Sequence, residues 1–310
     1  NGCKNWQKLN GTPNMAFRDL VIQRRENDLV AASFGRGFYV LDDYSPLRNF
    51  SNENLKNKGY LFPIKDGKWF IQRSNLGNTG ADFYLAENPK YGVTMTYHLS
   101  ESFETKAEKR KKNEKRLNQK LLNVPFPGYN DLDEEKNETP AYIKILIEDE
   151  NGNIIRHLKE RARGGTNRIT WDLRHMFKGP VTDSNKKYNL RGPIVKPGKY
   201  SATLYLVESG LTKKLSEKKS FELKSIYEST LKGTSFADYN KYVDDYFKTY
   251  NEVESIEHNL KAIDKKVNSL KTAIENTPIK TKELVSDFHN LKNSLLLIKR
   301  RVFGNESKTE

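Results

Sequence analysis

Between Ala141 and Leu206, short runs of alternating apolar and polar residues are separated by turn residues, and this pattern restricts the fold more than any other feature. The first run, Tyr142–Ile147, is rich in β-branched residues, and Asn151-Gly152 separates it from Ile154–Leu158. An Asn-Gly pair between apolar runs favours a type I′ turn, because both of its central residues need a positive φ. The pattern therefore predicts an antiparallel pair of strands.

Two more alternating runs complete this region. In Arg168–Leu173 every second side chain is apolar, so these side chains share one face of a strand. Pro197-Gly198 precedes the last run, Tyr200–Leu206, and marks a turn because proline fixes φ and glycine accepts a left-handed backbone. The four runs predict two packed sheets, an immunoglobulin-like β-sandwich.

Further strands and one insertion extend the predicted sandwich. We expect additional strands at Tyr60–Ile64, Trp69–Ile71, Val93–Leu99 and Phe221–Leu223. The insertion, about residues 101–140, contains a charged helix over Glu101–Lys120 and an acidic segment, Asp131–Glu135. Its clustered carboxylates could bind calcium, but the glycine-spaced ligand pattern of an EF-hand is missing, so we expect a solvated loop.

The sequence pattern of residues 1–46 predicts a separate β-meander. Apolar runs at Phe17–Ile22, Leu29–Phe34 and Phe38–Leu41 are divided by a polar turn and by Gly35-Arg36-Gly37. So few short strands cannot enclose a stable core. We therefore expect this sheet to belong to a larger repeated array.

From Phe236 onward the apolar residues follow a heptad spacing instead of alternation. The first helix carries an a/d seam made of Tyr246, Val253, Ile256, Leu260, Ile263, Val267, Leu270 and Ile274. A second seam follows at Leu284, Phe288, Leu291, Leu295, Ile298 and Val302. Thr277-Pro278 ends the first helix and Gly304 ends the second. The short connector predicts an antiparallel helical hairpin, whose charged faces could recruit a partner helix.

Composition narrows the classes of partner. A net charge of +14 would suit binding to a nucleic acid, but the basic residues are interleaved with 40 acidic ones and no nucleic-acid motif accompanies them, so we expect a solvated surface.

One cysteine, Cys3, excludes an internal disulfide and a thiolate metal cluster. No apolar run approaches the roughly 20 residues that span a bilayer. The chain begins at Asn1 without a methionine, and we expect a longer protein whose signal peptide lies outside this sequence.

Motifs that would identify a reaction are missing from the sequence. The five histidines lie far apart without a metal-ligand spacing, and neither Gly-x-Ser-x-Gly nor a phosphate-binding Gly-Lys-Ser/Thr loop occurs. We therefore expect no cofactor and no catalytic residue in this chain. Glycosidases need two carboxylates across a cleft, whereas the neighbours Asp42 and Asp43 would point to opposite faces of a strand.

Several motifs resemble a known family. Asn1-Gly2-Cys3-Lys4-Asn5-Trp6 resembles a degenerate BNR repeat, or Asp-box, the Asp-x-Gly-x-Thr-Trp hairpin of sialidase-type and sortilin-type β-propellers, with Trp6 kept and Asn1 in place of the aspartate. Phe17–Val30 and Phe34–Asp43 are similar to the final blade of bacterial sortilin-like proteins, which are often labelled glycosyl hydrolases. The similarity continues through Asp43–Arg48, Leu61–Pro63, Asn88–Gly92 and Pro197–Tyr200.

The sandwich also resembles the immunoglobulin-like module of bacterial flagellar hook-capping proteins. This second resemblance rests on Asn151-Gly152-Asn153, Trp171-Asp172 and Pro197–Tyr200. Modules of that kind usually serve as spacers or docking surfaces. The resemblance therefore implies a role in binding or assembly for this part of the chain.

The resemblances imply the non-catalytic scaffold or binding region of a secreted or periplasmic sortilin-like propeller protein. One alternative is the C-terminal part of a glycoside hydrolase whose catalytic carboxylates lie upstream, and another is a basic adaptor that binds a partner through its helical hairpin. The candidate cleft residues are Arg24, Arg36, Tyr39, Asp42 and Asp43. Of these, Arg36, Tyr39 and Asp42 would complete a hydrolase cleft, although Asp42 could instead pair with Arg36 or Arg24 to hold the blade together.

The predicted organisation has three parts. Residues 1–46 form the last propeller blade, residues 47–226 form the sandwich with its linker and insertion, and residues 227–310 form the helical hairpin. The implied partners are upstream propeller blades of the same protein and a glycan or protein ligand. We expect neither a nucleic-acid partner nor a transmembrane segment.

Overall fold

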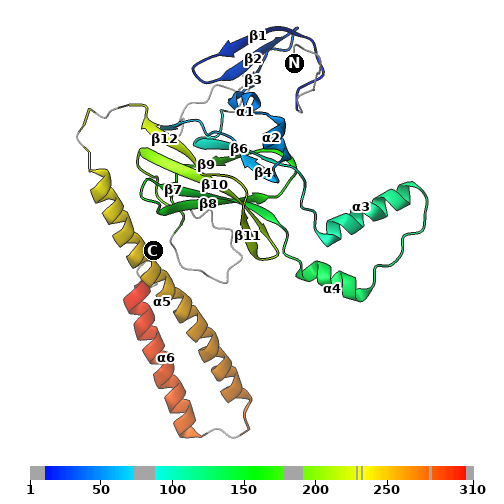
Figure 1. Cartoon of the computed structure of the whole chain (residues 1–310). Coiled ribbons are helices and arrows are strands. Elements are labelled where there is room, and N and C mark those ends of the chain that lie inside the picture. Colours follow the sequence, from blue (N-terminus) through cyan, green and yellow to red (C-terminus); the bar gives the residue numbers. More distant parts are fainter. Residues whose placement is uncertain are drawn as a thin grey trace. The chain divides into compact units, whose positions relative to one another are not determined.

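The computed structural model describes residues 11–72, 88–177, 191–227, 230–231, 233–278 and 281–304 (Figure 1). The fold combines β-sheets with α-helices, as predicted. The chain divides into two compact units, residues 1–176 with 194–229 and residues 177–193 with 230–310. Among the described residues, no helix has the length and apolar character needed to cross a membrane. The Asp-box-like segment at Asn1–Trp6 lies outside the described residues.

The first unit begins with a three-stranded antiparallel sheet, here called the N-terminal sheet. Its strands, in the order β1-β2-β3, are β1 (Phe17–Gln23), β2 (Asp28–Ser33) and β3 (Phe38–Leu41). Val30 on the central strand pairs with Val21 on one side and with Val40 on the other. The polar turn predicted before β2 therefore lies at the same end of the sheet as the C-terminus of β3. Two short helices, α1 (Ser45–Arg48) and α2 (Asn52–Lys56), follow.

Two further sheets form a sandwich in the same unit. The smaller sheet has the order β4-β6-β9, with β4 (Gly59–Leu61), β6 (Val93–Leu99) and β9 (Gly165–Trp171). The larger sheet has the order β5-β12-β10-β7-β8, and a sixth strand, β11, pairs with β10. The bounds of its strands are β5 (Gly67–Trp69), β7 (Tyr142–Asp149), β8 (Ile154–Arg161), β10 (Gly198–Glu208), β11 (Leu211–Lys214) and β12 (Lys219–Ser225). The sequence predicted the bounds of β6 correctly, but Trp69 ends β5 instead of beginning a strand.

Side chains from both sheets share one apolar core. The alternation in β7 buries Ile143, Ile145 and Ile147 completely, as the sequence pattern requires. Trp171, also fully buried, lies edge-on to the ring of Tyr200, with ring centroids 5.4 Å apart, and its indole N–H donates to the carbonyl of Arg174 at 2.9 Å. The tryptophan therefore contributes apolar area and still satisfies its single donor.

The turn between β7 and β8 differs from the predicted type I′ turn. Gly152 has a φ of 81°, but Asn151 is not among the residues with positive φ. The carboxylate of Asp149 instead accepts hydrogen bonds from the backbone N–H groups of Asn151 and Asn153, at 2.9 and 2.8 Å. The Asp149 carboxylate thus stabilises this turn, which is longer than the two-residue turn that the Asn-Gly pair predicted.

The insertion between β6 and β7 forms two helices, α3 (Lys106–Gln119) and α4 (Tyr129–Asn137). The charged helix is confirmed, and Thr105 begins it with a capping box. The prediction of a loop over the acidic segment is wrong, because this segment belongs to α4. Its Glu135 accepts two hydrogen bonds from the guanidinium of Arg110 on α3, at 2.7 and 2.8 Å. Neutralisation by the basic helix explains why a carboxylate-rich segment folds here.

The second unit contains two helices, α5 (Phe236–Asn276) and α6 (Lys282–Phe303). Ser235 and Thr281 cap their N-termini, and Gly304, with a φ of 80°, ends α6 as predicted. Leu260, Val267 and Leu295 form the buried centre of the contact between the helices. The predicted helical hairpin is therefore present in the structure.

Two buried tyrosines provide a matched test of the sandwich core. The hydroxyl of Tyr97 has no hydrogen-bond partner among the described residues, and burial raises its pKa to about 12. The hydroxyl of Tyr200 donates to the carbonyl of Lys196 at 2.7 Å. Tyr97→Phe should leave the free energy of unfolding unchanged or raise it by up to about 1 kcal/mol, whereas Tyr200→Phe should lower it by about 1 kcal/mol. Urea denaturation of both variants measures the difference, and equal losses would contradict the assignment.

Candidate functional site

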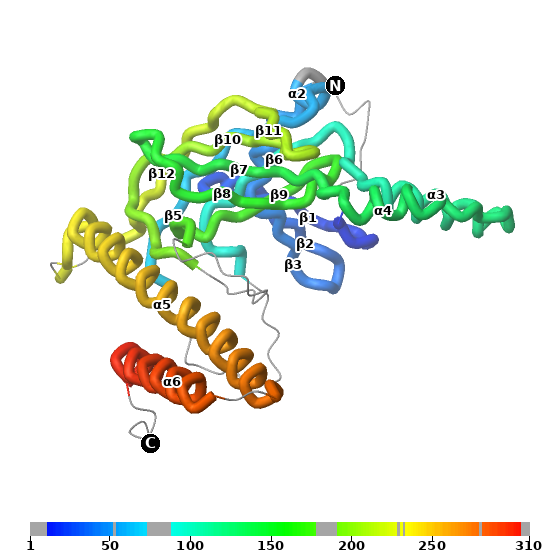
Figure 2. The backbone as a smooth tube through the Cα atoms, turned by 90° about the horizontal axis from the view of Figure 1, so that it is seen from below, coloured from blue at the N-terminus to red at the C-terminus, as the bar shows by residue number. Residues whose placement is uncertain are grey.

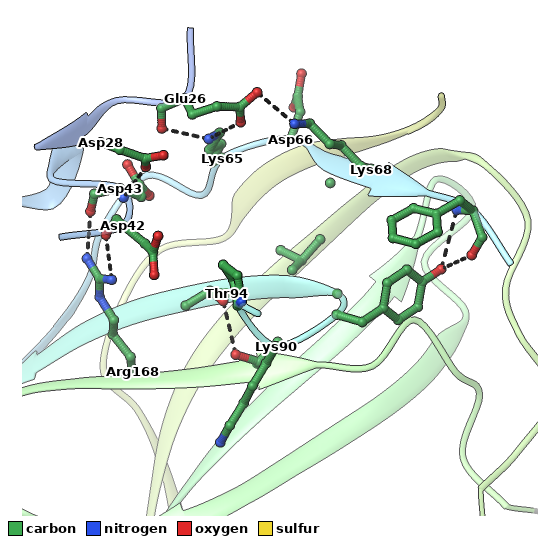
Figure 3. A pocket seen from close by; sticks show the side chains of 17 residues that line it. Glu26, Asp28, Asp42, Asp43, Lys65, Asp66, Lys68, Lys90, Thr94 and Arg168 are labelled. Carbon is green, nitrogen blue, oxygen red and sulfur yellow. Dashed lines mark hydrogen bonds and ion pairs between the residues drawn. The ribbon is translucent and has the colours of Figure 1, made fainter. Parts of the chain in front are cut away.

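A cavity of about 570 Å³ lies between one end of the N-terminal sheet and the sandwich (Figure 3). Five acidic and four basic residues line it, together with aromatic and small residues. Its volume falls within the range of ligand pockets, and nine of its 17 lining residues are charged. The cavity is therefore the strongest candidate for a binding site in the first unit.

Glu26, in the turn between β1 and β2, forms the upper wall of the cavity in Figure 3. Its two carboxylate oxygens accept from the ammonium groups of Lys65 and Lys68, at 2.7 and 2.6 Å, and its backbone carbonyl accepts from Lys65 as well. The hydrogen bond from Lys65 and then that from Lys68 lower the pKa of Glu26 from 4.5 to about 2. This carboxyl group is therefore an anchor that stays ionised, and its charge joins the N-terminal sheet to the sandwich.

Arg168 makes the second connection between the N-terminal sheet and the sandwich. From β9, its guanidinium donates to the backbone carbonyls of Asp42 and Asp43, at 2.7 and 2.5 Å. Asp43 has a φ of 42°, and its side chain accepts from the N–H and hydroxyl of Ser45. The left-handed backbone turns the two carbonyls toward Arg168, and the side-chain bonds hold that conformation.

The sandwich side of the cavity is fixed by paired side chains. Tyr91 lies edge-on to Phe70 with ring centroids 4.7 Å apart and donates to its carbonyl at 2.5 Å, and burial raises the pKa of this tyrosine. The hydroxyls of Thr94 and Thr170 are 3.0 Å apart. At Gly92, any Cβ would lie 1.8 Å from the carbonyl oxygen of Trp171, so only glycine fits this close approach.

Most charged groups around the cavity already have partners. The carboxylate of Asp66 is 2.6 Å from Lys224, whose hydrogen bond lowers the pKa of Asp66. By contrast, the Asp42 carboxylate and the Lys90 ammonium are exposed and form no ion pair within the described part of the chain. The Asp42 carboxylate is available to hydrogen-bond a polar ligand in the cavity, whereas the Lys90 side chain extends away from the space below Glu26 in Figure 3. A general acid would need a raised pKa, but Glu26 and Asp66 both shift downward.

The structure separates the five residues that the sequence proposed for the cleft. Asp42 and Asp43 line the cavity, while Arg24, Arg36 and Tyr39 do not. Arg24 and Arg36 are exposed near turns and form no ion pair with Asp42 in the described ranges, and Tyr39 packs edge-on to Phe17. The predicted pairing of Asp42 with either arginine is therefore absent.

Sequence reasoning missed the residues that build the junction. Lys65, Lys68 and Arg168 lie far from Glu26 and Asp42 in the sequence, and no local pattern links them. Glu26 was identified only as part of a polar turn. Within the described residues, no group of three or more histidine, cysteine or acidic side chains could hold a metal ion.

Comparisons with known proteins add little to this picture. No protein-family model matches the sequence, and no curated protein matches it. The crystal structure of CopC from Methylosinus trichosporium OB3b is similar over 55% of this chain and 98% of that chain, with 10% identity and a TM-score of 0.22. A similarity this weak carries no argument about fold or function.

The pKa of Glu26 predicts an acid-sensitive junction. Since this pKa is lower in the folded protein than its ordinary value of 4.5, the stabilisation is complete above pH 4.5 and disappears as the pH falls toward about 2. Glu26→Gln should therefore lower the free energy of unfolding by about 1–2 kcal/mol at neutral pH, and the difference from the wild type should shrink below pH 4.5. Urea denaturation over a pH series measures this difference.

Glu101→Gln is the matched control, because Glu101 forms only an exposed contact of 3.9 Å with Lys58. It should change stability by less than about 0.5 kcal/mol at any pH. If both variants behaved alike, the account of the junction would be wrong.

Proposed function

We propose that this chain is the non-catalytic scaffold and binding region of a sortilin-like β-propeller protein. In this proposal the N-terminal sheet is a propeller blade that packs against further blades, and the sandwich is an immunoglobulin-like module attached to it. The observation that carries the proposal is that the N-terminal sheet exposes apolar side chains on both of its faces.

Cross-strand register assigns the side chains to the two faces. Val21, Val30 and Val40 are direct neighbours across the strands, and Phe38 lies on the same face as Val40. The other face carries Leu20 with Ile22, which alternate with Val21 along β1. Leu20, Val21, Ile22, Phe38 and Val40 are 47–76% exposed. A sheet that is apolar on both faces is typical of the middle layer in a stack of sheets.

Among the described residues, the attachment of the sheet leaves apolar side chains exposed on both faces. Glu26 lies in the turn at one end of the sheet, and the carbonyls of Asp42 and Asp43 follow β3 at the same end. The sandwich therefore contacts the sheet through this end, by hydrogen bonds and ion pairs. Apolar faces of this extent are unusual on an isolated soluble domain and usually mark a protein interface.

The cavity supports a binding role better than a catalytic one. Asp42 offers an exposed acceptor in a cavity that the aromatic residue Tyr91 also lines, an arrangement that suits a hydroxyl-rich glycan or a polar peptide segment. The alternative, a glycoside hydrolase part, places the catalytic carboxylates upstream of this sequence, because a general acid needs a raised pKa and the pKa values of Glu26 and Asp66 both shift downward. A secreted or periplasmic location is part of the proposal, because it follows from the sortilin-like resemblance.

Charged substitutions on the two faces test the proposal. Val21→Lys with Val40→Lys alters one face, and Leu20→Lys with Ile22→Lys alters the other. Because these positions are exposed, both double variants should fold with stability within about 1 kcal/mol of the wild type. Each should lose a large part of the fluorescence of bound bis-ANS, a dye that reports exposed apolar surface.

Ile154→Lys with Leu211→Lys is the control, since it adds the same charge at exposed apolar positions of the sandwich. The proposal expects this control to retain more dye binding than either face variant, and equal losses in all three would refute it. A panel of nitrophenyl glycosides tests the catalytic alternative. Turnover that disappears in Asp42→Asn would establish the hydrolase and overturn the non-catalytic assignment.

A further inference from the structure

The two helices of the second unit differ greatly in length. α5 has 41 residues and α6 has 22. Asp264 on α5 pairs with Lys299 on α6 at 2.6 Å, which sets the two antiparallel helices in register. α6 therefore runs along the C-terminal part of α5, from about residue 260, and residues 236–258 extend beyond it (Figures 1 and 2).

The apolar seam of the hairpin is buried at only half of its positions. On α5, Leu260 and Val267 occupy heptad position a, and both are 5% exposed. On α6, Leu295 occupies position a and belongs to the same buried cluster as Leu260 and Val267. The d positions of both helices, in contrast, are 42–49% exposed: Ile256, Ile263, Leu270, Leu284, Leu291 and Ile298.

The exposed positions lie on one side of the contact between the helices. Equivalent heptad positions of antiparallel helices fall on the same side of their contact, so the two d stripes border one shared groove. The opposite side carries the e positions, where Asp264 and Lys299 form an ion pair beside a hollow that both residues line. The exposed apolar d stripes and this charged hollow therefore lie on opposite sides of the contact.

The extended half of α5 carries an apolar seam of its own, whose side chains are exposed. Tyr242, Tyr246, Val253 and Ile256 continue the a/d pattern and are all exposed. The other side of this half is covered, because Phe247 is buried and lies edge-on to the ring of Phe177. Within the described ranges, an exposed groove and an exposed apolar helix seam thus occur in the same polypeptide.

We propose that two copies of this chain form an antiparallel dimer through α5. In this dimer, residues 242–258 of each copy occupy the groove between α5 and α6 of the other copy. Two three-helix bundles then result, related by a two-fold axis perpendicular to α5. Such an interface is isologous, because the same groove and the same helix segment are used by both copies.

Charge complementarity fixes the register. Glu252 and Lys266 both occupy position g beside the exposed stripe, both are exposed, and neither has an ion-pair partner among the described residues. In an antiparallel pair of helices, g positions face each other, so Glu252 of one copy can meet Lys266 of the other twice. This register sets residue 258 opposite residue 260 and residue 242 opposite residue 276, so that residues 242–258 run along the part of α5 that α6 covers.

The contact area suits a reversible dimer. Both helices are present only along residues 260–276 of α5, so each groove is about 25 Å long, and a helix in it presents a strip about 10 Å wide. Counting both surfaces of two grooves gives roughly 1,000 Å² of buried area, which is about the least expected of a specific protein interface. No other helix in the described residues presents an apolar seam of this length.

Sedimentation velocity of the whole chain over a dilution series tests the dimer. The wild type should dissociate reversibly from dimer to monomer. Glu252→Lys and Lys266→Glu should each raise the dimer dissociation constant about tenfold or more, because two attractive contacts become repulsive. The double variant Glu252→Lys with Lys266→Glu should restore dimerisation, and Lys265→Glu, a neighbouring change on the opposite side of the helix, should have no effect.

A disulfide test addresses the register independently. The two-fold axis places Asn259, another exposed g position, opposite Asn259 of the second copy. In a Cys3→Ser background, Asn259→Cys should therefore form an intermolecular disulfide under mild oxidation, whereas Lys265→Cys should not. Circular dichroism confirms that each variant keeps its helical content.

Three results would overturn the proposal. A chain that stays monomeric at every concentration would show that another partner, or none, fills the groove. A dimer that is insensitive to the charge substitutions would use a different surface. Equal cross-linking of the Asn259→Cys and Lys265→Cys variants would contradict the antiparallel register.

Discussion

The connection between the N-terminal sheet and the sandwich is polar and confined to one end of the sheet. Glu26 accepts from two lysines, and Arg168 donates to two successive backbone carbonyls. Such contacts give orientation without burying apolar area, because charge-assisted hydrogen bonds depend strongly on geometry. The sandwich, which has its own core, does not need the sheet, but the sheet depends on this junction for its position.

This type of attachment explains why both faces of the N-terminal sheet remain apolar and exposed. A face-to-face contact with the sandwich would have buried one of them and left the other to solvent, with the usual alternation of apolar and polar residues. Instead, β1 carries Leu20, Val21 and Ile22 in succession. In the second unit, an ion pair lies on one side of the helical contact and exposed apolar d positions lie on the other. Both units therefore expose apolar side chains beside polar contacts.

Local patterns of apolar residues predicted the strands and helices well wherever one face of the element is buried. Alternation located β6 and β7, and heptad spacing with Pro278 and Gly304 located both helices. The turn at Asn151 and the helix α4 were predicted wrongly, because each depends on hydrogen bonds or ion pairs to groups that the local pattern does not reveal. The site was the least predictable part. Arg168 approaches Asp42 only through the tertiary fold, and the two residues are 126 positions apart.

Heptad positions illustrate the same limit in the second unit. The sequence treats positions a and d of α5 as equivalent members of one seam, whereas the structure buries Leu260 and exposes Ile263. The difference arises from the rotation of the two helices about their own axes, which depends on contacts such as that between Asp264 and Lys299. A sequence pattern can therefore identify an apolar stripe without showing how much of it remains available to a partner.

Hydrogen–deuterium exchange of the whole chain tests most directly the claim that the N-terminal sheet is a lightly attached module. Amides in β1, β2 and β3 should exchange through local opening, well before those of β6, β7 and β10, because their protection rests on the end junction and not on a shared core. Glu26→Gln should accelerate exchange in the sheet and leave the sandwich unchanged. Equal protection of the sheet and the sandwich, lost together in a single cooperative step, would contradict the account.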